Sequence, residues 1–294
     1  MAASGPLFPE LHDDWPVLRD ALDALGVEAT TAVWSDPSVE WASFDLVLAN
    51  GTWGNIHEVE AFLSWVDRLE AAGVAVRNSP ATLRWNIDKR YLRDLQAAGV
   101  PTVPTIWVEP SSPDTADVLP GGEVVVKPSI SGGGYRTARY GAGEHEAVRA
   151  HIAALTADGR TAMVQPYEAR VDTDGETALV FVAGRFTHAL HKGPMIRRGT
   201  GPLDSLMDNL VIAGGTATPA QRDVATGALH VAEDLLGPTT YARVDLVARA
   251  DGTPAVLELE LLDPVLFFTK HRDGPDAAKA LAEVLAAATR RARA

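Results

Sequence analysis

Cysteine is absent from this sequence of 294 residues. Its absence excludes disulfides, thiolate zinc sites and cysteine nucleophiles. The sequence also lacks any apolar run long enough to cross a bilayer. Its first residues, Met-Ala-Ala-Ser-Gly-Pro, have neither the basic region nor the apolar region of a signal peptide. We therefore expect a cytoplasmic protein that has no membrane partner.

Positive charge is also scarce. The 26 Lys and Arg residues are outnumbered by 39 Asp and Glu residues, and the net charge is −13. Nucleic acid is not an expected partner, because phosphate backbones require clustered Lys and Arg. A few local cations could still bind a small anion. The hydrophobic content of 46% is that of an ordinary globular protein, and the length allows two or three lobes.

The N-terminal residues 1–80 alternate helical and strand patterns. Apolar spacing predicts helices over 12–25 and 58–72, each followed by a glycine, and short strands over 45–49 and 74–76. Such alternation is typical of a small parallel α/β lobe. No strand pattern is visible in residues 1–11, so we expect this lobe to be reduced.

The remaining chain predicts α+β structure with mostly antiparallel strands. A helix is expected over 81–98, and residues 193–217 read as irregular. Further strands are expected over 103–108, 122–127, 135–140, 162–166, 177–182 and 186–191, and further helices over 144–155, 219–236 and 276–291.

The stretch with the clearest chemistry consists of two strand patterns, 241–248 and 256–264, joined by a turn at 251–254. Alternate side chains of a strand share a face, so Glu258 and Glu260 point one way and Leu257 the other. Arg243 and Asp245 are related in the same way, and pairing of the strands would bring all four charged side chains together. Crowded carboxylates without His or Cys favour magnesium or manganese over zinc. The alternative is a solvated acidic face.

A second candidate is the strand ending in Lys127, followed by the glycine-rich segment 129–137. Glycines allow backbone N–H groups to approach an anion, and the lysine adds positive charge. The segment is neither a Walker A loop nor a dinucleotide fingerprint, and a simple hairpin turn is the alternative interpretation. His188 and His191 are three apart on a strand and face opposite sides, which disfavours a shared zinc ion. No Gly-x-Ser-x-Gly elbow is present, which argues against a serine hydrolase.

The order of these features resembles the ATP-grasp superfamily over about residues 80–272. The most specific part is Arg243-Val-Asp245 followed by Glu258-Leu-Glu260. More narrowly, the chain is similar to the group of the O-ureido-serine cyclo-ligase of cycloserine biosynthesis, which is itself similar to glutathione synthetase. The stretches that carry this likeness are residues 83–92, 164–167, 174–179 and 257–264.

The resemblance implies α/β plus α+β architecture: an ATP-grasp fold with a reduced N-terminal α/β lobe, followed in the chain by two α+β subdomains that clamp ATP between them. The expected domains are the N-terminal lobe at 1–80, a subdomain with the glycine-rich flap at 81–167, and a subdomain with the metal and ATP site at 168–294. The expected cofactors are ATP and Mg²⁺, with Mn²⁺ as a substitute.

The resemblance also assigns a role to individual residues. Asp245, Glu258 and Glu260 match the magnesium ligands, and Lys192 and Arg243 match catalytic groups near the transferred phosphate. The residues that match ATP contacts are Lys89, Lys127, Ser131, Gly132, Gly133, Gly134, Gln165, Pro166, Tyr167, Glu168, Glu176 and Asn209.

The implied reaction is ligation of a small amino-acid-like carboxylate, activated as an acyl phosphate, to a nitrogen nucleophile, with release of ADP and phosphate. Intramolecular cyclisation is one version. A kinase-like phosphotransferase and a non-catalytic nucleotide-binding regulator are the alternatives. The loop Asn50–Gly54 departs from the Arg-Ser-Thr-Trp-Asp type of sequence of related proteins, so the two substrates stay open. So does the oligomeric state, for which a homodimer is one option.

Overall fold

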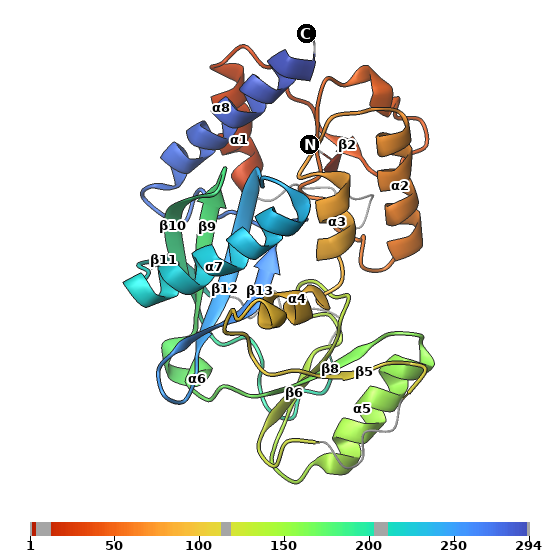
Figure 1. Ribbon diagram of the computed structural model, residues 1–294, viewed down its shortest axis with the longest axis vertical. Helices are drawn as coiled ribbons and strands as arrows, with labels where there is room; N and C mark the ends of the chain where they lie inside the picture. Colours follow the sequence, from red (N-terminus) through yellow and green to blue (C-terminus); the bar gives the residue numbers. More distant parts are fainter. Residues whose placement is uncertain (1, 4–12, 113–118, 203–210, 293–294) are drawn as a thin grey trace.

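The computed structural model describes residues 2–3, 13–112, 119–202 and 211–292. Within these ranges, helices accompany a five-stranded sheet, a four-stranded sheet and two pairs of strands (Figure 1). The four-stranded sheet and its helix lie at one end of the molecule, and the N-terminal residues pack beside the five-stranded sheet at the other. The expected mixture of α/β and α+β structure is confirmed.

The N-terminal lobe contains parallel strand pairs and an aromatic core. Its elements are β1 (Ala2–Ala3), α1 (Asp14–Asp23), β2 (Ala32–Val33), the 3-10 helix η1 (Trp41–Ser43), β3 (Val47–Leu48), α2 (Val59–Ala71) and β4 (Val76–Arg77). Strand β3 pairs in parallel with β4, and Trp34, Phe62 and Trp65 are buried beside them. The expectation of no strand in residues 1–11 is wrong, because β1 pairs in parallel with β2.

The single helix expected over 81–98 is two helices, α3 (Pro80–Asn86) and α4 (Tyr91–Ala97). Ser79 caps the first, since its hydroxyl accepts from the Thr82 N–H at 3.2 Å. In the break between the helices, the backbone N–H of Lys89 donates to the carbonyl of Ser129 at 2.9 Å. A contact across the fold thus replaces a helical hydrogen bond and leaves Lys89 in a turn.

The four-stranded sheet has the order β5-β8-β6-β7, and every pairing in it is antiparallel. Its strands are β5 (Ile106–Val108), β6 (Val124–Pro128), β7 (Ala138–Tyr140) and β8 (Ala162–Pro166), with α5 (His145–Ala157) between the last two. Val148, Ile152 and Leu155 of α5 are buried against the sheet. Strand β6 therefore presents Lys127 on the sheet face opposite this helix, toward the rest of the molecule.

The five-stranded sheet has the order β11-β10-β9-β12-β13. Its elements are α6 (Val171–Asp174), β9 (Glu176–Val182), β10 (Arg185–Lys192), β11 (Ile212–Gly215), α7 (Pro219–Leu236), β12 (Tyr241–Ala248), β13 (Pro254–Glu260) and α8 (Gly274–Ala292). The expectation that residues 193–217 are irregular is wrong in part. Strand β11 lies within them and pairs with β10.

The two faces of this sheet are covered by different helices. Alternate residues such as Leu179 and Val244 pack with α7 in one core, while Val180 and Tyr241 pack with α8 and α1 in another. Further along this second face, β12 continues with Arg243 and Asp245. This face is thus apolar where α8 packs on it and charged beyond the part that α8 covers. The charged part lies opposite the four-stranded sheet.

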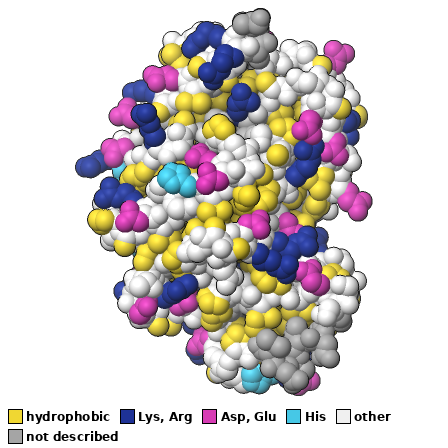
Figure 2. All heavy atoms as spheres, in the orientation of Figure 1, with side chains coloured by type: hydrophobic (Ala, Val, Ile, Leu, Met, Phe, Trp, Pro, Cys, Tyr) yellow, Lys and Arg dark blue, Asp and Glu magenta, His cyan; other side chains and the backbone are white. Residues whose placement is uncertain are grey.

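Basic and acidic side chains are intermixed on the face of the molecule that Figure 2 shows. Hydrophobic side chains are visible between them and do not form one large continuous area there. Among the helices in the described parts of the chain, none combines the length and apolar character that a membrane span requires.

Candidate active site

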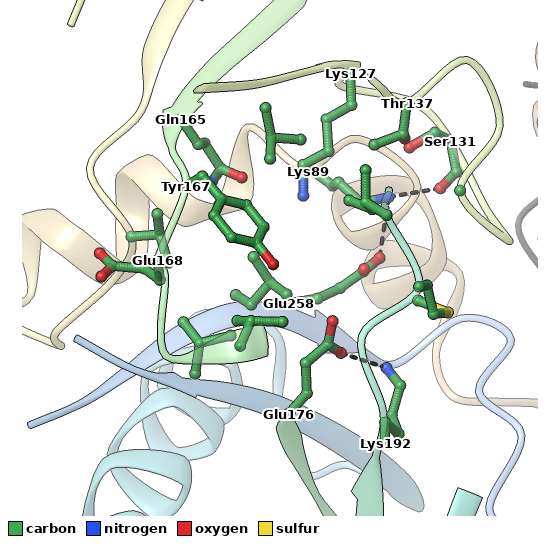
Figure 3. A pocket seen from close by; sticks show the side chains of 18 of the residues that line it. Lys89, Lys127, Ser131, Thr137, Gln165, Tyr167, Glu168, Glu176, Lys192 and Glu258 are labelled. Carbon is green, nitrogen blue, oxygen red and sulfur yellow. Dashed lines mark hydrogen bonds and ion pairs between the residues drawn. The ribbon is translucent and has the colours of Figure 1, made fainter. Parts of the chain in front are cut away.

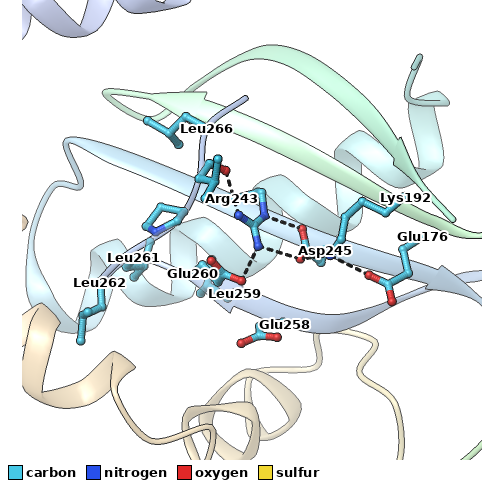
Figure 4. Close-up of polar contacts among 12 residues, drawn as sticks. Glu176, Lys192, Arg243, Asp245, Glu258, Leu259, Glu260, Leu261, Leu262 and Leu266 are labelled. Atoms are coloured by element: carbon cyan, nitrogen blue, oxygen red, sulfur yellow. Dashed lines mark hydrogen bonds and ion pairs between the residues drawn. The ribbon is translucent and has the colours of Figure 1, made fainter. Parts of the chain in front are cut away.

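The paired strands β12 and β13 bring four charged side chains together, as the alternation of the sequence predicted. Arg243 lies opposite Glu260, and Asp245 lies opposite Glu258. The Arg243 guanidinium donates to Asp245 through Nε at 2.9 Å and Nη2 at 3.1 Å, and it also contacts Glu260 (Figure 4). Two carboxylates therefore contact one guanidinium on this face of the hairpin, and Glu258, opposite Asp245, is a third carboxylate on the same face.

The expected orientation of Leu257 is wrong. The register shifts between Asp245 and Leu246, so that Glu258 pairs with Asp245 while Val256 pairs with Leu246. Leu257 is the extra residue of a β-bulge, which bends a strand and redirects its side chains. Leu257 and Glu258 consequently both reach the charged face, where the alternation of a regular strand would have separated them.

Lys192 connects this hairpin to Glu176. Its Nζ lies 2.8 Å from Glu176 Oε2 and 2.8 Å from Asp245 Oδ2 (Figure 4). Burial opposes the charge of Lys192, but Asp245 and Glu176 outweigh it and raise the pKa of Lys192. Burial likewise opposes the ionisation of Asp245, yet Arg243 and Lys192 hold the pKa of Asp245 below its usual range. These groups stay charged because they are paired.

Two further lysines line a gap beside the hairpin, and one of them contacts the hairpin. Lys89 Nζ lies 3.0 Å from Glu258 Oε1 and donates to the Ser131 carbonyl at 2.5 Å (Figure 3). Burial lowers the pKa of Lys127 to about 8, although Glu258 opposes the shift. Burial pushes the pKa of Glu258 upward, but Lys89 and Lys127 outweigh it and lower this pKa overall. The positive side of the gap is therefore built from the turn at Lys89 and the end of β6.

The glycine-rich segment after β6 borders the same gap. Gly133 and Gly134 have φ angles of 59° and 77°, a conformation that glycine adopts at least cost. The ring of Tyr135 packs edge-on against His57, with centroids 4.8 Å apart. The segment thus rests on the N-terminal loop that follows Asn50–Gly54.

The end of β8 forms another wall. Gln165 is buried, and its Nε2 donates to Thr105 Oγ1 at 2.9 Å. The Tyr167 hydroxyl donates to Asp172 at 2.6 Å, and the guanidinium of Arg139 stacks on the Tyr167 ring at 3.4 Å. These contacts fix the segment that passes from the four-stranded sheet toward the five-stranded sheet.

All these elements line one cavity that is partly open to solvent. It is lined by most of the residues that the resemblance singled out: Lys89, Lys127, Ser131, Gly132, Gly133, Gly134, Gln165, Pro166, Tyr167, Glu168, Glu176, Lys192, Glu258 and Glu260. Arg243 and Asp245 lie behind the lining, in contact with Glu260 and Lys192. Asn209 lies outside the described residues.

The cavity also has an apolar lining that the sequence analysis did not identify. It consists of Val103, Val125, Val171, Met195, Ile196, Val247 and Leu257. Alternation could have found Val125 and Val247, because they lie two positions from Lys127 and Asp245 on the same strand faces. The others come from loops, from α6 and from the bulge, and no local pattern marks them. Apolar walls with a few charged groups are typical of small-molecule sites.

The carboxylates of the cavity suit a cation that shares its ligands with a bound molecule. No group of three or more His, Cys, Asp or Glu within the described ranges could hold a metal ion by itself, and both oxygens of Asp245 are bonded to Lys192 and Arg243. Glu258 and Glu260 line the cavity. Burial raises the pKa of Glu260 to about 8; Arg243 opposes the shift and Glu258 adds to it. Mg²⁺ commonly uses one or two carboxylates plus substrate phosphates, so this donor set fits it.

Comparison with known proteins identifies relatives of this chain. The family described as the N-terminal domain of D-cycloserine synthetase DcsG matches residues 1–78. The cycloserine biosynthesis protein DcsG of Streptomyces lavendulae is 37% identical over 284 residues, which cover 92% of this chain and 94% of that protein.

Solved structures give the same result. The crystal structure of D-cycloserine synthetase DcsG superposes with a TM-score of 0.88 at 34% identity, over 97% of this chain and 98% of that one. The ATP-grasp ligase PsnB, in complex with a minimal precursor, Mg and ADP, superposes with a TM-score of 0.61 at 19% identity, over 98% and 96%. The fold is that of an ATP-grasp ligase, and the cavity lies between its two sheets. Within that class, the chain belongs to the DcsG family.

Proposed function

We propose that this ATP-dependent ligase activates a small amino-acid-like carboxylate as an acyl phosphate and joins it to a nitrogen nucleophile, releasing ADP and phosphate. The observation that carries the proposal is the opposition of Lys89 and Lys127 to Glu258 and Glu260 across one cavity. Basic side chains on one wall suit the phosphates of ATP, and carboxylates on the other suit Mg²⁺. The apolar lining suits the nucleobase.

The chemistry follows from charge. A carboxylate oxygen attacks the terminal phosphorus of ATP, the bond from phosphorus to the ADP oxygen breaks, and an acyl phosphate forms. A nitrogen then attacks the acyl carbon, phosphate leaves, and the nitrogen loses a proton. Two like charges 4 Å apart repel by about 4 kcal/mol at an effective dielectric constant near 20. No nucleophilic side chain is required, so charge compensation and exclusion of water are the main tasks of the protein.

Each group of the cavity has a place in this scheme. We assign Lys89, Lys127 and the backbone of Ser131–Gly134 to the phosphates, the segment Gln165–Glu168 to adenine, and Glu176 to the ribose. Glu258 and Glu260 would hold Mg²⁺, which when bound neutralises phosphate charge; Asp245 could join them only if Lys192 or Arg243 released it. Lys192 and Arg243 would stabilise the transferred phosphate through this network. A role for Asn209, the use of Mn²⁺, a cytoplasmic location and a homodimer stay predictions.

The test is ADP release with candidate substrates. O-ureido-serine carries the carboxylate and the nitrogen in one molecule, whereas a simple amino acid with hydroxylamine supplies them separately. We expect ADP release only when both groups are present, with a ligated or cyclised product in equal amount. ADP release with a carboxylate alone, leaving a stable phosphorylated product, would instead indicate a kinase.

Glu258→Gln tests the metal assignment. Loss of one charge term of about 4 kcal/mol corresponds to a roughly thousandfold loss of turnover, and we expect at least a hundredfold. Glu283→Gln is the matched control, because Glu283 is exposed on α8, and it should retain wild-type turnover. Persistent turnover in Glu258→Gln would contradict the assignment.

A further inference from the structure

Strand β13, which carries Glu258 and Glu260, lies at the edge of the five-stranded sheet. The outer backbone groups of an edge strand need other partners when they are buried. At the start of β13, residues 101–103 supply them: Val256 N–H donates to the Pro101 carbonyl at 2.8 Å, and Val103 N–H donates to the Val256 carbonyl at 3.1 Å. Leu259 and, just beyond β13, Leu261 and Leu262 are buried as well, and their outer backbone groups have side-chain partners.

The hydrogen-bond partners at the outer edge of β13 and just beyond it are the side chains of Tyr91 and Asn86. The Leu259 N–H donates to the Tyr91 hydroxyl at 2.9 Å, and Asn86 Nδ2 donates to the Leu259 carbonyl at 2.8 Å. Asn86 Oδ1 accepts from the N–H groups of Leu261 at 2.7 Å and Leu262 at 2.9 Å. Both side chains are more than nine-tenths buried. Together they make the hydrogen bonds that a neighbouring strand would make.

These bonds bracket the two glutamates. Leu259 lies between Glu258 and Glu260, and Leu261 follows directly (Figure 4). Neither Asn86 nor Tyr91 belongs to the lining of the cavity, so they act on the backbone that carries the carboxylates and not on a ligand. Their helices, α3 and α4, are held in turn by the Lys89 N–H on the Ser129 carbonyl.

We propose that Asn86 and Tyr91 are positioning residues, which hold Glu258 and Glu260 in the geometry needed to bind Mg²⁺ together with a nucleotide. The proposal rests on the proposed function, because that function places the metal at these carboxylates. Residues that support metal ligands from behind typically change metal affinity by about 10–100-fold when they are replaced.

The experiment measures ADP binding by calorimetry in the presence of Mg²⁺ and in the presence of EDTA. The variants are Tyr91→Phe, which removes only the hydroxyl, and Asn86→Leu. The control is Tyr140→Phe, because the Tyr140 hydroxyl on β7 is also buried but lies away from β13, 3.1 Å from His151 Nδ1 on α5. Circular dichroism verifies that each variant is folded, and Tyr91→Phe decides the test if Asn86→Leu does not fold.

We expect Mg²⁺ to increase the ADP affinity of the wild type and of Tyr140→Phe by the same factor. In Tyr91→Phe and Asn86→Leu this factor should fall about tenfold or more, while the affinity in EDTA stays within twofold of wild type. An unchanged factor in folded Tyr91→Phe overturns the positioning role and leaves the proposed function intact. An equal loss of affinity with and without Mg²⁺ also overturns it, because that would be a general structural effect. If the wild type gains nothing from Mg²⁺, both proposals are wrong.

Discussion

At the scale of single residues, the site is organised by pairing of buried charge. Glu258 is paired with Lys89, Asp245 with Lys192, and Glu260 with Arg243. An unpaired charge as deeply buried as that of Asp245 or Lys192 would cost several kcal/mol. In the proposed function, ligand binding would therefore be an exchange of partners: a phosphate that approaches Lys89 would compete with Glu258, and a cation that binds Glu258 would free Lys89. We expect Mg²⁺ and the nucleotide to strengthen each other's binding for this reason.

Buried His188 makes the protein sensitive to acid. Its Nε2 lies 2.9 Å from the Leu266 carbonyl and so carries the proton of the neutral ring. Burial lowers the pKa of His188 to about 4 from the ordinary 6.5. Because the folded-state pKa is depressed, the stabilising contribution is fully present above pH 6.5 and is lost progressively as the pH falls from 6.5 to 4. At pH 5 the loss is about 2 kcal/mol, at 1.36 kcal/mol per pH unit.

Replacement of His188 by Gln keeps a donor for the carbonyl and removes the titration. We expect the drop in free energy of unfolding between pH 7 and pH 5 to be smaller in His188→Gln than in the wild type, as measured by urea unfolding. His230→Gln is the control, since His230 is exposed on α7, and it should follow the wild type. Identical drops in all three proteins would refute the role of His188.

At the scale of elements, the bulge in β13 decides which side chains serve the core and which serve the cavity. Leu259 is fully buried between the sheet and α7, whereas Leu257 is partly buried and lines the cavity. Glu258 lies between them in the sequence and shares a face with Leu257. One extra residue thus places an apolar and a charged neighbour on the same wall of the site.

Two leucine truncations should separate the contribution to core packing from the contribution to the cavity lining. Leu259→Ala is expected to lower the free energy of unfolding by about 2–5 kcal/mol, as for other fully buried leucines, with little effect on nucleotide affinity in the folded protein. Leu257→Ala should cost less than about 1 kcal/mol of stability, because its side chain is already partly in solvent, and should weaken ATP binding several-fold. Denaturant unfolding and calorimetry measure the two effects. Equal effects of both truncations on ATP affinity would contradict the bulge argument.

At the scale of the whole molecule, one arginine ties the two sheets together beside the cavity. Arg139 on β7 of the four-stranded sheet forms two bonds of 2.9 Å with Asp172 on α6 and one of 2.8 Å with Glu123. It also stacks on Tyr167 in the segment between the sheets. Arg198, from the loop after β10, contacts Glu123 as well. The cavity depends on how the sheets are placed, so this network should support ligand binding.

Arg139→Met tests this connection. Removing one partner of a buried ion pair costs about 3–5 kcal/mol; here Asp172 is partly exposed, so we expect roughly 2 kcal/mol, together with weaker ATP binding. Arg170→Met is the matched control, because the pair of Arg170 with Asp174 is about 40% exposed on both sides and such pairs contribute at most about 1 kcal/mol. Urea unfolding and calorimetry provide the comparison. Equal stability of the two variants would show that Arg139 does not link the sheets.

Much of this arrangement follows from local patterns. Apolar spacing located α2, α5, α7 and α8, and alternation predicted that Arg243, Asp245, Glu258 and Glu260 share a face. Local patterns work here because helices and hairpins are made by residues close in sequence, whose spacing repeats with the element. The order of the charged motifs then identified the ATP-grasp class, which the fold and the relatives confirm.

Other features were decided only by contacts between distant segments. The break before Lys89 exists because its N–H bonds to Ser129, the strand β1 exists through pairing with β2, and Leu257 faces the cavity because the register shifts. No local propensity encodes these outcomes, since each depends on a partner far along the chain. The sequence alone thus predicted most of the charged groups that gather at the cavity, and it determined the class of protein. The tertiary structure decided how Lys89, the apolar walls and the edge of β13 are placed around them.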